Sequence, residues 1–218
     1  MAVAFNAASQ TSRWGSGSSN QIIISHTVAG ANTYMFVGIS TNQAVTPTSV
    51  TYNGDALALV ASKTDTDYDI WVYGMVAPDD GTHDVTVTLS GATMFIHGQA
   101  LSYTGVDQTD PIGDTSTNAN TSGSPTQSVD TETANSWIVD FLTISTDGAS
   151  VSPLDGQTER QKTALGIIFA AYDQATTSAG TYDSDYDLTS GEWTIVSSEL
   201  KEAGGAAATY ISAPLNII

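Results

Sequence analysis

Carboxylates that recur at alternate positions are the residues of this chain best suited to chemistry. Asp65, Asp67 and Asp69 form one such run. In a loop, this spacing can surround a hard cation such as Ca²⁺ with oxygen ligands. The central Gly and the closing Glu of an EF-hand are both missing. We predict a Ca²⁺ site at Asp65, Asp67 and Asp69, with a solvated acidic face as the alternative.

A second run of carboxylates occupies residues 183–187 with the same spacing. Here Ser184, Tyr186 and Leu188 alternate with the carboxylates, which is the pattern of a strand with one buried and one wet face. We therefore expect these carboxylates on the solvent face of a strand, with Ca²⁺ binding as the alternative.

Side chains for acid–base or nucleophilic catalysis are few. His26, His83 and His97 are the only histidines, and they fall in or beside strand-like runs. The sequence has no G-x-S-x-G pattern for a Ser–His–Asp hydrolase, no cysteine, and no histidine cluster with zinc spacing. Glu159 and Glu199 lie near basic residues, as on solvated faces, which argues against the carboxylate pair of a glycosidase. We therefore predict that the protein is not an enzyme.

Exposed aromatic rings would suit a sugar-binding surface. Trp71, Trp137 and Trp193 lie in strand-like runs and are expected to fill the core. Trp14 lies in a Ser/Gly-rich opening segment, so we predict it at an interface.

Short β-branched and aromatic runs, separated by turn residues, must position these side chains. Val85, Val87 and Leu89 alternate with polar residues, and Asn53-Gly54 is typical of a hairpin turn. This pattern predicts an all-β protein, a jelly-roll-like, two-sheet antiparallel β-sandwich. The expected strands are residues 21–28, 34–40, 49–52, 69–76, 83–89, 94–103, 127–130, 137–145, 165–172, 182–188 and 192–200.

Two stretches 99 residues apart align without gaps. Residues 81–89 (GTHDVTVTL) match residues 180–188 (GTYDSDYDL), and the register extends to Leu101 and Leu200. A duplicated block of strands predicts a sandwich built from two pseudo-repeated halves.

The 218 residues fit a single β-sandwich domain, 1–218. Within it we expect residues 1–20 to form a loose N-terminal arm and residues 109–125 to form a crossover between the halves. Residues 203–218 read as a tail whose apolar end forms a last strand or an arm that docks on a neighbouring subunit.

The charge balance limits the partners. The chain has 23 acidic against five basic residues, for a net charge of −18 at pH 7. Such a surface repels nucleic-acid phosphates and anionic membranes. No apolar run approaches the ~20 residues that span a bilayer, and the N-terminus lacks the features of a signal peptide. We therefore expect neither nucleic-acid nor membrane binding, and synthesis in the cytoplasm.

An ordered series of motifs carries a resemblance to a known group of proteins. The series is TYNG-x-x-L at 51–57, IWVY at 70–73, APDDGTHDVTV at 77–87 and ALSYTGVDQTDPIG at 100–113. It resembles a jelly-roll-like domain of tailed-bacteriophage structural proteins and some bacterial surface proteins, over most of residues 20–202. The group offers no catalytic residues to carry over.

The resemblance implies a non-enzymatic virion structural protein, a capsid decoration or cement protein, assembled in a host cytoplasm. Its expected partners are the major capsid protein or other virion proteins and further copies of itself, in a homo-oligomer. The alternative is a carbohydrate-binding or adhesive β-sandwich module, such as part of a tail fibre or surface protein, with Ca²⁺ at Asp65, Asp67 and Asp69.

Overall fold

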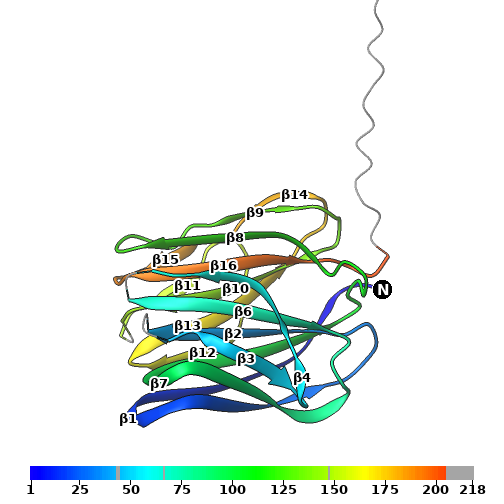
Figure 1. Cartoon of the computed structure of the whole chain (residues 1–218). Coiled ribbons are helices and arrows are strands. Elements are labelled where there is room, and N and C mark those ends of the chain that lie inside the picture. Colours follow the sequence, from blue (N-terminus) through cyan, green and yellow to red (C-terminus); the bar gives the residue numbers. More distant parts are fainter. Residues whose placement is uncertain (43–44, 66, 147, 205–218) are drawn as a thin grey trace, which may run out of the picture.

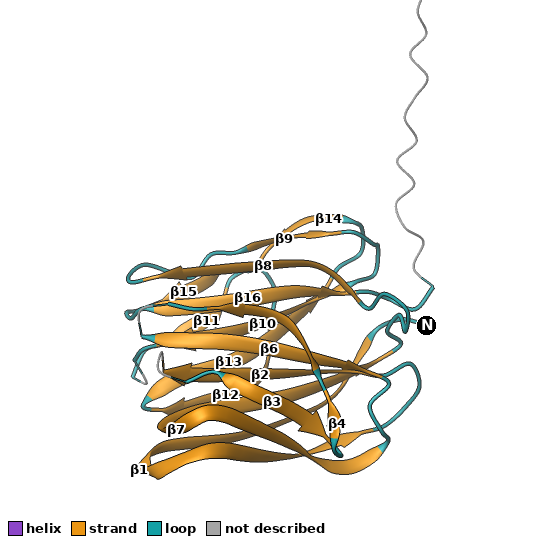
Figure 2. Cartoon of the chain, viewed as in Figure 1, coloured by secondary structure: helices purple, strands orange, loops and turns teal. Residues whose placement is uncertain are grey.

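The computed structural model describes residues 1–42, 45–65, 67–146 and 148–204. In these residues the regular structure consists of antiparallel β-strands joined by turns and loops, as Figure 2 shows. The all-β, antiparallel prediction is therefore confirmed.

Seven strands form the first sheet, in the order β4-β3-β7-β2-β6-β5, with β1 paired to β7. The first half of β7 pairs with β3 and the second half with β2, so the sheet curls. Because the consecutive strands β4 and β5 lie at opposite edges, the curled sheet is nearly closed, like a barrel. The strands are β1 (Ala4–Val28), β2 (Tyr34–Asn42), β3 (Pro47–Tyr52), β4 (Asp55–Ala56), β5 (Ala58–Lys63), β6 (Tyr68–Val76) and β7 (Gly81–Thr104).

Five strands form the second sheet, in the order β12-β13-β10-β16-β8, and two strand pairs, β11–β15 and β9–β14, accompany it. In Figure 1, β1 and β7 lie at one side of the molecule and β9 and β14 at the other. The strands are β8 (Ile112–Asn120), β9 (Ser128–Thr131), β10 (Trp137–Ile144), β11 (Val151–Pro153), β12 (Thr158–Leu165), β13 (Ile167–Ala175), β14 (Gly180–Asp183), β15 (Tyr186–Leu188) and β16 (Trp193–Leu200).

Three hydrophobic cores follow from this arrangement. Core 1 fills the curl of the first sheet, with residues such as Val37 and Val87, and core 3 joins the second sheet to β11 and β15, with residues such as Leu142 and Tyr186. Core 2 takes side chains from both large sheets and therefore holds them together. It comprises Val3, Tyr34, Phe36, Ile70, Val72, Leu101, Tyr103, Val106, Val139, Phe141, Phe169, Ala171, Val196 and Leu200.

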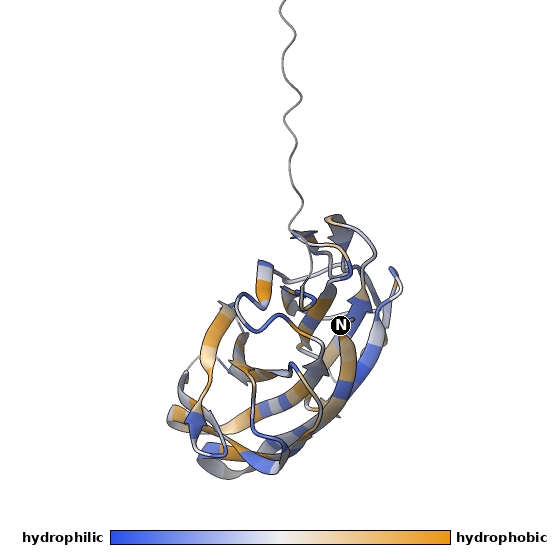
Figure 3. Ribbon diagram, turned by 90° about the vertical axis from the view of Figure 1, so that its right-hand side faces the viewer, coloured by the Kyte–Doolittle hydropathy of each residue, from blue (hydrophilic) through white to orange (hydrophobic). Residues whose placement is uncertain are grey.

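Local sequence patterns account for several strands. Val85, Val87 and Leu89 are buried while the residues between them are at least partly exposed, as predicted. Figure 3 shows the same alternation of hydrophobic and hydrophilic residues along several strands. Asn53 and Gly54 have φ values of 50° and 94°, so they form the predicted turn between β3 and β4.

The close approach of the two large sheets depends on one glycine. Gly38 in β2 faces the ring of Phe141 in β10, and a Cβ at residue 38 would overlap that ring. A glycine inside a strand here marks a close contact between layers rather than a turn.

Three segments differ from the prediction. Residues 4–20, expected as a loose arm, belong to β1 and pair with β7. Residues 109–125, expected as a crossover, contain β8, which belongs to the second sheet and pairs with β16, and the link between the two large sheets consists of residues 105–111. Residues 90–93, which separate the expected strands 83–89 and 94–103, lie inside the continuous strand β7. Of the predicted tail, residues 205–218 lie outside the described residues.

The physical reason is the same for β1 and β8. Both segments are rich in Ser, Thr, Asn and Gln, so they carry little hydropathy signal. Main-chain hydrogen bonds to a neighbouring strand satisfy their backbones, and those bonds do not depend on side-chain type.

Candidate functional site

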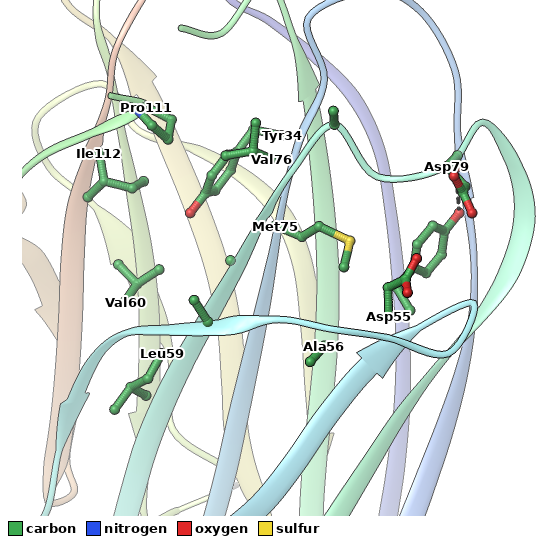
Figure 4. Close-up of a pocket in the computed structure, with 14 residues that line it drawn as sticks. Tyr34, Asp55, Ala56, Leu59, Val60, Met75, Val76, Asp79, Pro111 and Ile112 are labelled. Carbon is green, nitrogen blue, oxygen red and sulfur yellow. Dashed lines mark hydrogen bonds between the residues drawn. The ribbon is translucent and has the colours of Figure 1, made fainter. Parts of the chain in front are cut away.

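A groove with a volume of about 680 Å³ lies beside the segment that links β4 to β5 (Figure 4). Figure 4 shows Val60 and Ile112 toward one end and Asp55 and Asp79 toward the other. The end of β6 and the start of β8 complete the walls. The groove is lined by residues 55–56, 58–60, 74–77 and 111–112, together with Tyr34, Tyr52 and Asp79.

Two tyrosines give the groove its polar groups. A Cβ at Gly74 would overlap the Tyr34 hydroxyl, so glycine there lets the ring of Tyr34 lie against β6. Burial raises the pKa of Tyr34, which keeps its hydroxyl protonated. At the other end, the Tyr52 hydroxyl donates to the carbonyl oxygens of Gly81 at 3.1 Å and Asp79 at 3.3 Å. The groove therefore combines apolar walls with phenol groups and two carboxylates.

The predicted Ca²⁺ residues lie at the start of β6. Asp69 is buried, and its Oδ1 accepts a hydrogen bond of 3.0 Å from the backbone amide of Asp65, while Asp67 is exposed. Burial is the main cause that raises the pKa of Asp69, and the charge of Asp65 adds to it. In the described residues, no group of three or more Asp, Glu, His or Cys side chains is arranged to hold a metal ion. Ca²⁺ binding at Asp65, Asp67 and Asp69 stays a prediction.

Sequence reasoning missed a fourth carboxylate beside this run. Glu192 precedes β16 in the second sheet, more than 120 positions away along the chain. Burial raises its pKa, and the negative charges of Asp67 and Asp65 raise it further. Asp65 and Asp67 before β6 and Glu192 before β16 therefore lie near enough to repel one another, and only the tertiary structure brings them together.

The second acidic run behaves as the alternation predicts. Ser184, Tyr186 and Leu188 are buried, whereas Asp183 and Asp187 are exposed. The strand is interrupted at residues 184–185, between β14 and β15. The carboxylates thus line the wet face of this segment.

Two of the three histidines, His26 and His97, are buried and form hydrogen bonds within the scaffold. His26 is buried between two hydroxyls, with Nδ1 3.1 Å from Ser9 Oγ and Nε2 3.1 Å from Ser102 Oγ. His97 Nδ1 lies 2.9 Å from Ser12 Oγ. Burial lowers the pKa of both imidazoles to about 4, so both are neutral at pH 7.

An ion pair between β12 and β13 of the second sheet receives a hydrogen bond from the first sheet. Arg160 Nε lies 2.8 Å from both carboxylate oxygens of Asp173, and the Tyr103 hydroxyl donates to Asp173 Oδ2 at 2.9 Å. The guanidinium carbon lies 4.2 Å from the ring centre of Phe5 and 5.7 Å from that of Trp137. The rings, the hydroxyl and the carboxylate enclose the cation, so the cluster stabilises contacts between strands.

Glu199 was expected on a solvated face, and that expectation is wrong. Its side chain is fully buried in β16. It accepts hydrogen bonds from the amides of Glu132 at 2.8 Å and Thr133 at 3.1 Å, and from the Ser136 hydroxyl at 2.6 Å. A Cβ at Gly113 would overlap this carboxylate. Amides from a distant loop make burial of the charge tolerable, which the neighbouring sequence does not reveal.

The tryptophans divide partly as predicted. Trp193 is buried, and Trp71 and Trp137 are partly buried against the cores. Trp14 is partly buried in β1, with its ring centre 4.3 Å from that of Phe95 and its indole against Gly166. A role for Trp14 at an interface stays a prediction.

No helix in the described part of the chain is long and apolar enough to cross a membrane. The chain matches none of the protein-family models against which it was scanned, and searches of curated proteins and of solved structures found no significant match to it.

Proposed function

We propose that this chain is a non-enzymatic virion structural protein, a decoration or cement protein on the capsid of a tailed bacteriophage. The observation that carries the non-enzymatic part is the use of the interior ionisable groups. His26, Asp173 and Glu199 are each held by hydrogen bonds to strands or loops of the scaffold. The described lining of the groove includes no Ser, His or Lys that could act as nucleophile or base beside its two carboxylates, Asp55 and Asp79. The virion part rests on the ordered motifs of residues 51–113.

The proposal includes a jelly-roll-like sandwich made of two pseudo-repeated halves. Strand pairings support the duplication. In the first half, β2 lies between β6 and the second half of β7, and in the second half β10 lies between β13 and β16. The start of β1 pairs with the end of β7 as β8 pairs with β16, and β5 pairs with β6 as β12 pairs with β13.

The smaller pairings follow the same scheme. The end of β1 and β3 both pair with the first half of β7. Correspondingly, β9 pairs with β14 and β11 pairs with β15. Cores 1 and 3 then belong to one half each, and core 2 lies between the halves.

The proposed partners are the major capsid protein or other virion proteins, and further copies of this chain. A net charge of −18 would keep decorated particles dispersed by mutual repulsion. To test the proposal, capsids stripped of the protein are incubated with the purified full chain and sedimented. We expect the chain to sediment with capsids and to raise the temperature at which they break. Co-purification with tails, or capsids unaffected by the chain, would contradict the decoration role.

The second candidate is a carbohydrate-binding or adhesive module that uses Ca²⁺. The repulsion of Glu192 by Asp65 and Asp67 favours it, because a divalent cation bound between these carboxylates would relieve that repulsion. A glycan array probed with the full chain, with Ca²⁺ and then with EDTA, separates the two candidates. Glycan binding that is lost in EDTA and in an Asp67→Asn variant, but kept in Asp187→Asn, would support this module.

A further inference from the structure

The curled first sheet has one seam that strand pairing leaves open. β4 pairs with β3 and β5 pairs with β6, and β6 pairs with β5 only as far as Gly74. In the described pairings, Met75 and Val76 continue to pair with β2 on one side and have no strand on the other. Both residues line the groove, so one wall of the groove is a free strand edge.

The rim of this groove carries apolar side chains that water contacts. Leu59 is 51% exposed and Val76 is 39% exposed. Ile112, partly buried, lies across the groove from the β6 edge (Figure 4). A free edge next to exposed apolar side chains is a surface that another segment of chain can cover.

The chain leaves the described fold beside this groove. The Lys201 amide donates to the Pro111 carbonyl at 2.8 Å, and the Ala203 amide donates to the Gly105 carbonyl at 2.8 Å. Pro111 itself lines the groove. The last described residues, 201–204, therefore lie beside the groove wall, and the 14 residues that follow have a contour length of roughly 46 Å.

The composition of residues 205–218 fits the groove. The segment reads GAAATYISAPLNII, with no charged side chain in a chain whose net charge is −18. Side chains without charge meet no repulsion from Asp55 and Asp79 at one end of the groove. Tyr210 and Ile211 have side chains that favour strands and apolar surfaces.

We propose that residues 205–218 bind in the groove of the same chain, with their apolar side chains covering Leu59, Val76 and Ile112. The segment adds main-chain hydrogen bonds to the free edge of β6, as in β-strand addition. The proposal does not depend on the virion role.

Paramagnetic relaxation tests the contact in the intact chain. Because the sequence has no cysteine, an Ala208→Cys substitution places a single nitroxide label in the segment. We expect the amide signals of Leu59, Val76 and Ile112 to broaden and that of Leu165 to stay sharp. Broadening spread evenly over the surface would overturn the proposal. So would broadening that arises only between labelled and unlabelled chains in a mixed sample, because the contact would then be intermolecular.

Two matched variants distinguish binding in the groove from nonspecific contact with exposed apolar side chains. Leu59 on β5 and Leu165 on β12 are both exposed leucines on edge strands, at 51% and 43% exposure. We expect Leu59→Asp to abolish the broadening and Leu165→Asp to preserve it, with far-ultraviolet circular dichroism confirming that both variants fold. Equal loss in both variants, or no loss in either, would overturn the proposal.

Proteolysis gives an independent readout. Chymotrypsin cleavage after Tyr210, followed by mass spectrometry, reports the fraction of chains whose segment is released. We expect Leu59→Asp to speed this cleavage by roughly 10-fold or more and Leu165→Asp to leave it unchanged. Cleavage of the unmodified chain as fast as that of Leu59→Asp would overturn the proposal.

Discussion

Among single residues, Asp140 is a carboxyl group whose ionisation is opposed by burial. Its side chain is fully buried in β10, where it accepts a hydrogen bond of 2.6 Å from the Tyr186 hydroxyl. Burial raises its pKa from 3.8 to about 6. The folded state therefore binds this proton more tightly than the unfolded state. Through this group, the free energy of unfolding is highest below pH 4 and falls as pH rises to about 6.

The Asp140→Asn substitution removes the ionisable group, and with it the fall in the free energy of unfolding between pH 4 and 6. We expect the variant to gain stability relative to the unmodified chain as pH rises from 4 to 6, by about 1–3 kcal/mol. Urea unfolding at pH 4, 5, 6 and 7 measures the difference. Asp187→Asn, at an exposed position, controls for the change in net charge. A stability difference between Asp140→Asn and the unmodified chain that does not vary with pH would contradict the prediction.

The buried imidazoles act in the opposite direction. Since burial lowers the pKa of His97 from 6.5 to about 4, the unfolded state binds this proton more tightly. The stability present above pH 6.5 is lost as pH falls toward 4. The His97→Gln variant can keep a hydrogen bond to Ser12. As pH falls from 6.5 to 4, we expect its free energy of unfolding to drop by about 1–3 kcal/mol less than that of the unmodified chain. Denaturation midpoints at pH 4.5 and 7 measure this, and a double variant with His26→Gln should show a larger effect.

At the scale of the elements, the contact between β2 and β10 depends on the absence of a side chain at Gly38. A Cβ there would overlap the Phe141 ring, so we expect Gly38→Ala to destabilise the fold by about 1–3 kcal/mol. Phe141→Leu in the same chain should recover part of the loss, because it removes the overlapping ring. Urea denaturation of the two single variants and the double variant gives the coupling energy. Additive effects would show that the two residues do not meet.

At the scale of the whole molecule, core 2 and the hydrogen bond from Tyr103 to Asp173 connect the two large sheets, and Arg160 pairs with Asp173 within the second sheet. Asp173 is 1% exposed at its side chain, and burial raises its pKa although Arg160 and Tyr103 oppose that rise. Arg160→Met would leave this carboxylate with one hydroxyl partner, so we expect a loss of about 3–5 kcal/mol. Adding Asp173→Asn should restore much of it. Calorimetric unfolding tests this, and a larger loss in the double variant than in Arg160→Met would contradict it.

The sequence alone was sufficient wherever the physical cause is local. Alternation of apolar residues placed Val85 and Val87 inside, and it placed Asp183 and Asp187 on a wet face. Side-chain period in a strand is a backbone property, so it is readable from neighbouring residues. Asn53-Gly54 marked its turn because few other residues adopt a positive φ easily. These signals together determined an all-β, antiparallel protein.

Only the tertiary structure decided what distant segments do to one another. The strands β1 and β8 form through main-chain pairing, which leaves no trace in hydropathy. Glu199 can be buried because backbone amides more than 60 positions away donate hydrogen bonds to its carboxylate. Glu192 lies near Asp65, from a distant part of the chain, and the charge of Asp65 raises the pKa of Glu192. One wall of the groove is formed because β6 extends beyond Gly74, where its pairing with β5 ends. In each case the cause is a partner supplied from elsewhere in the chain, so the residue's own neighbours could not predict it.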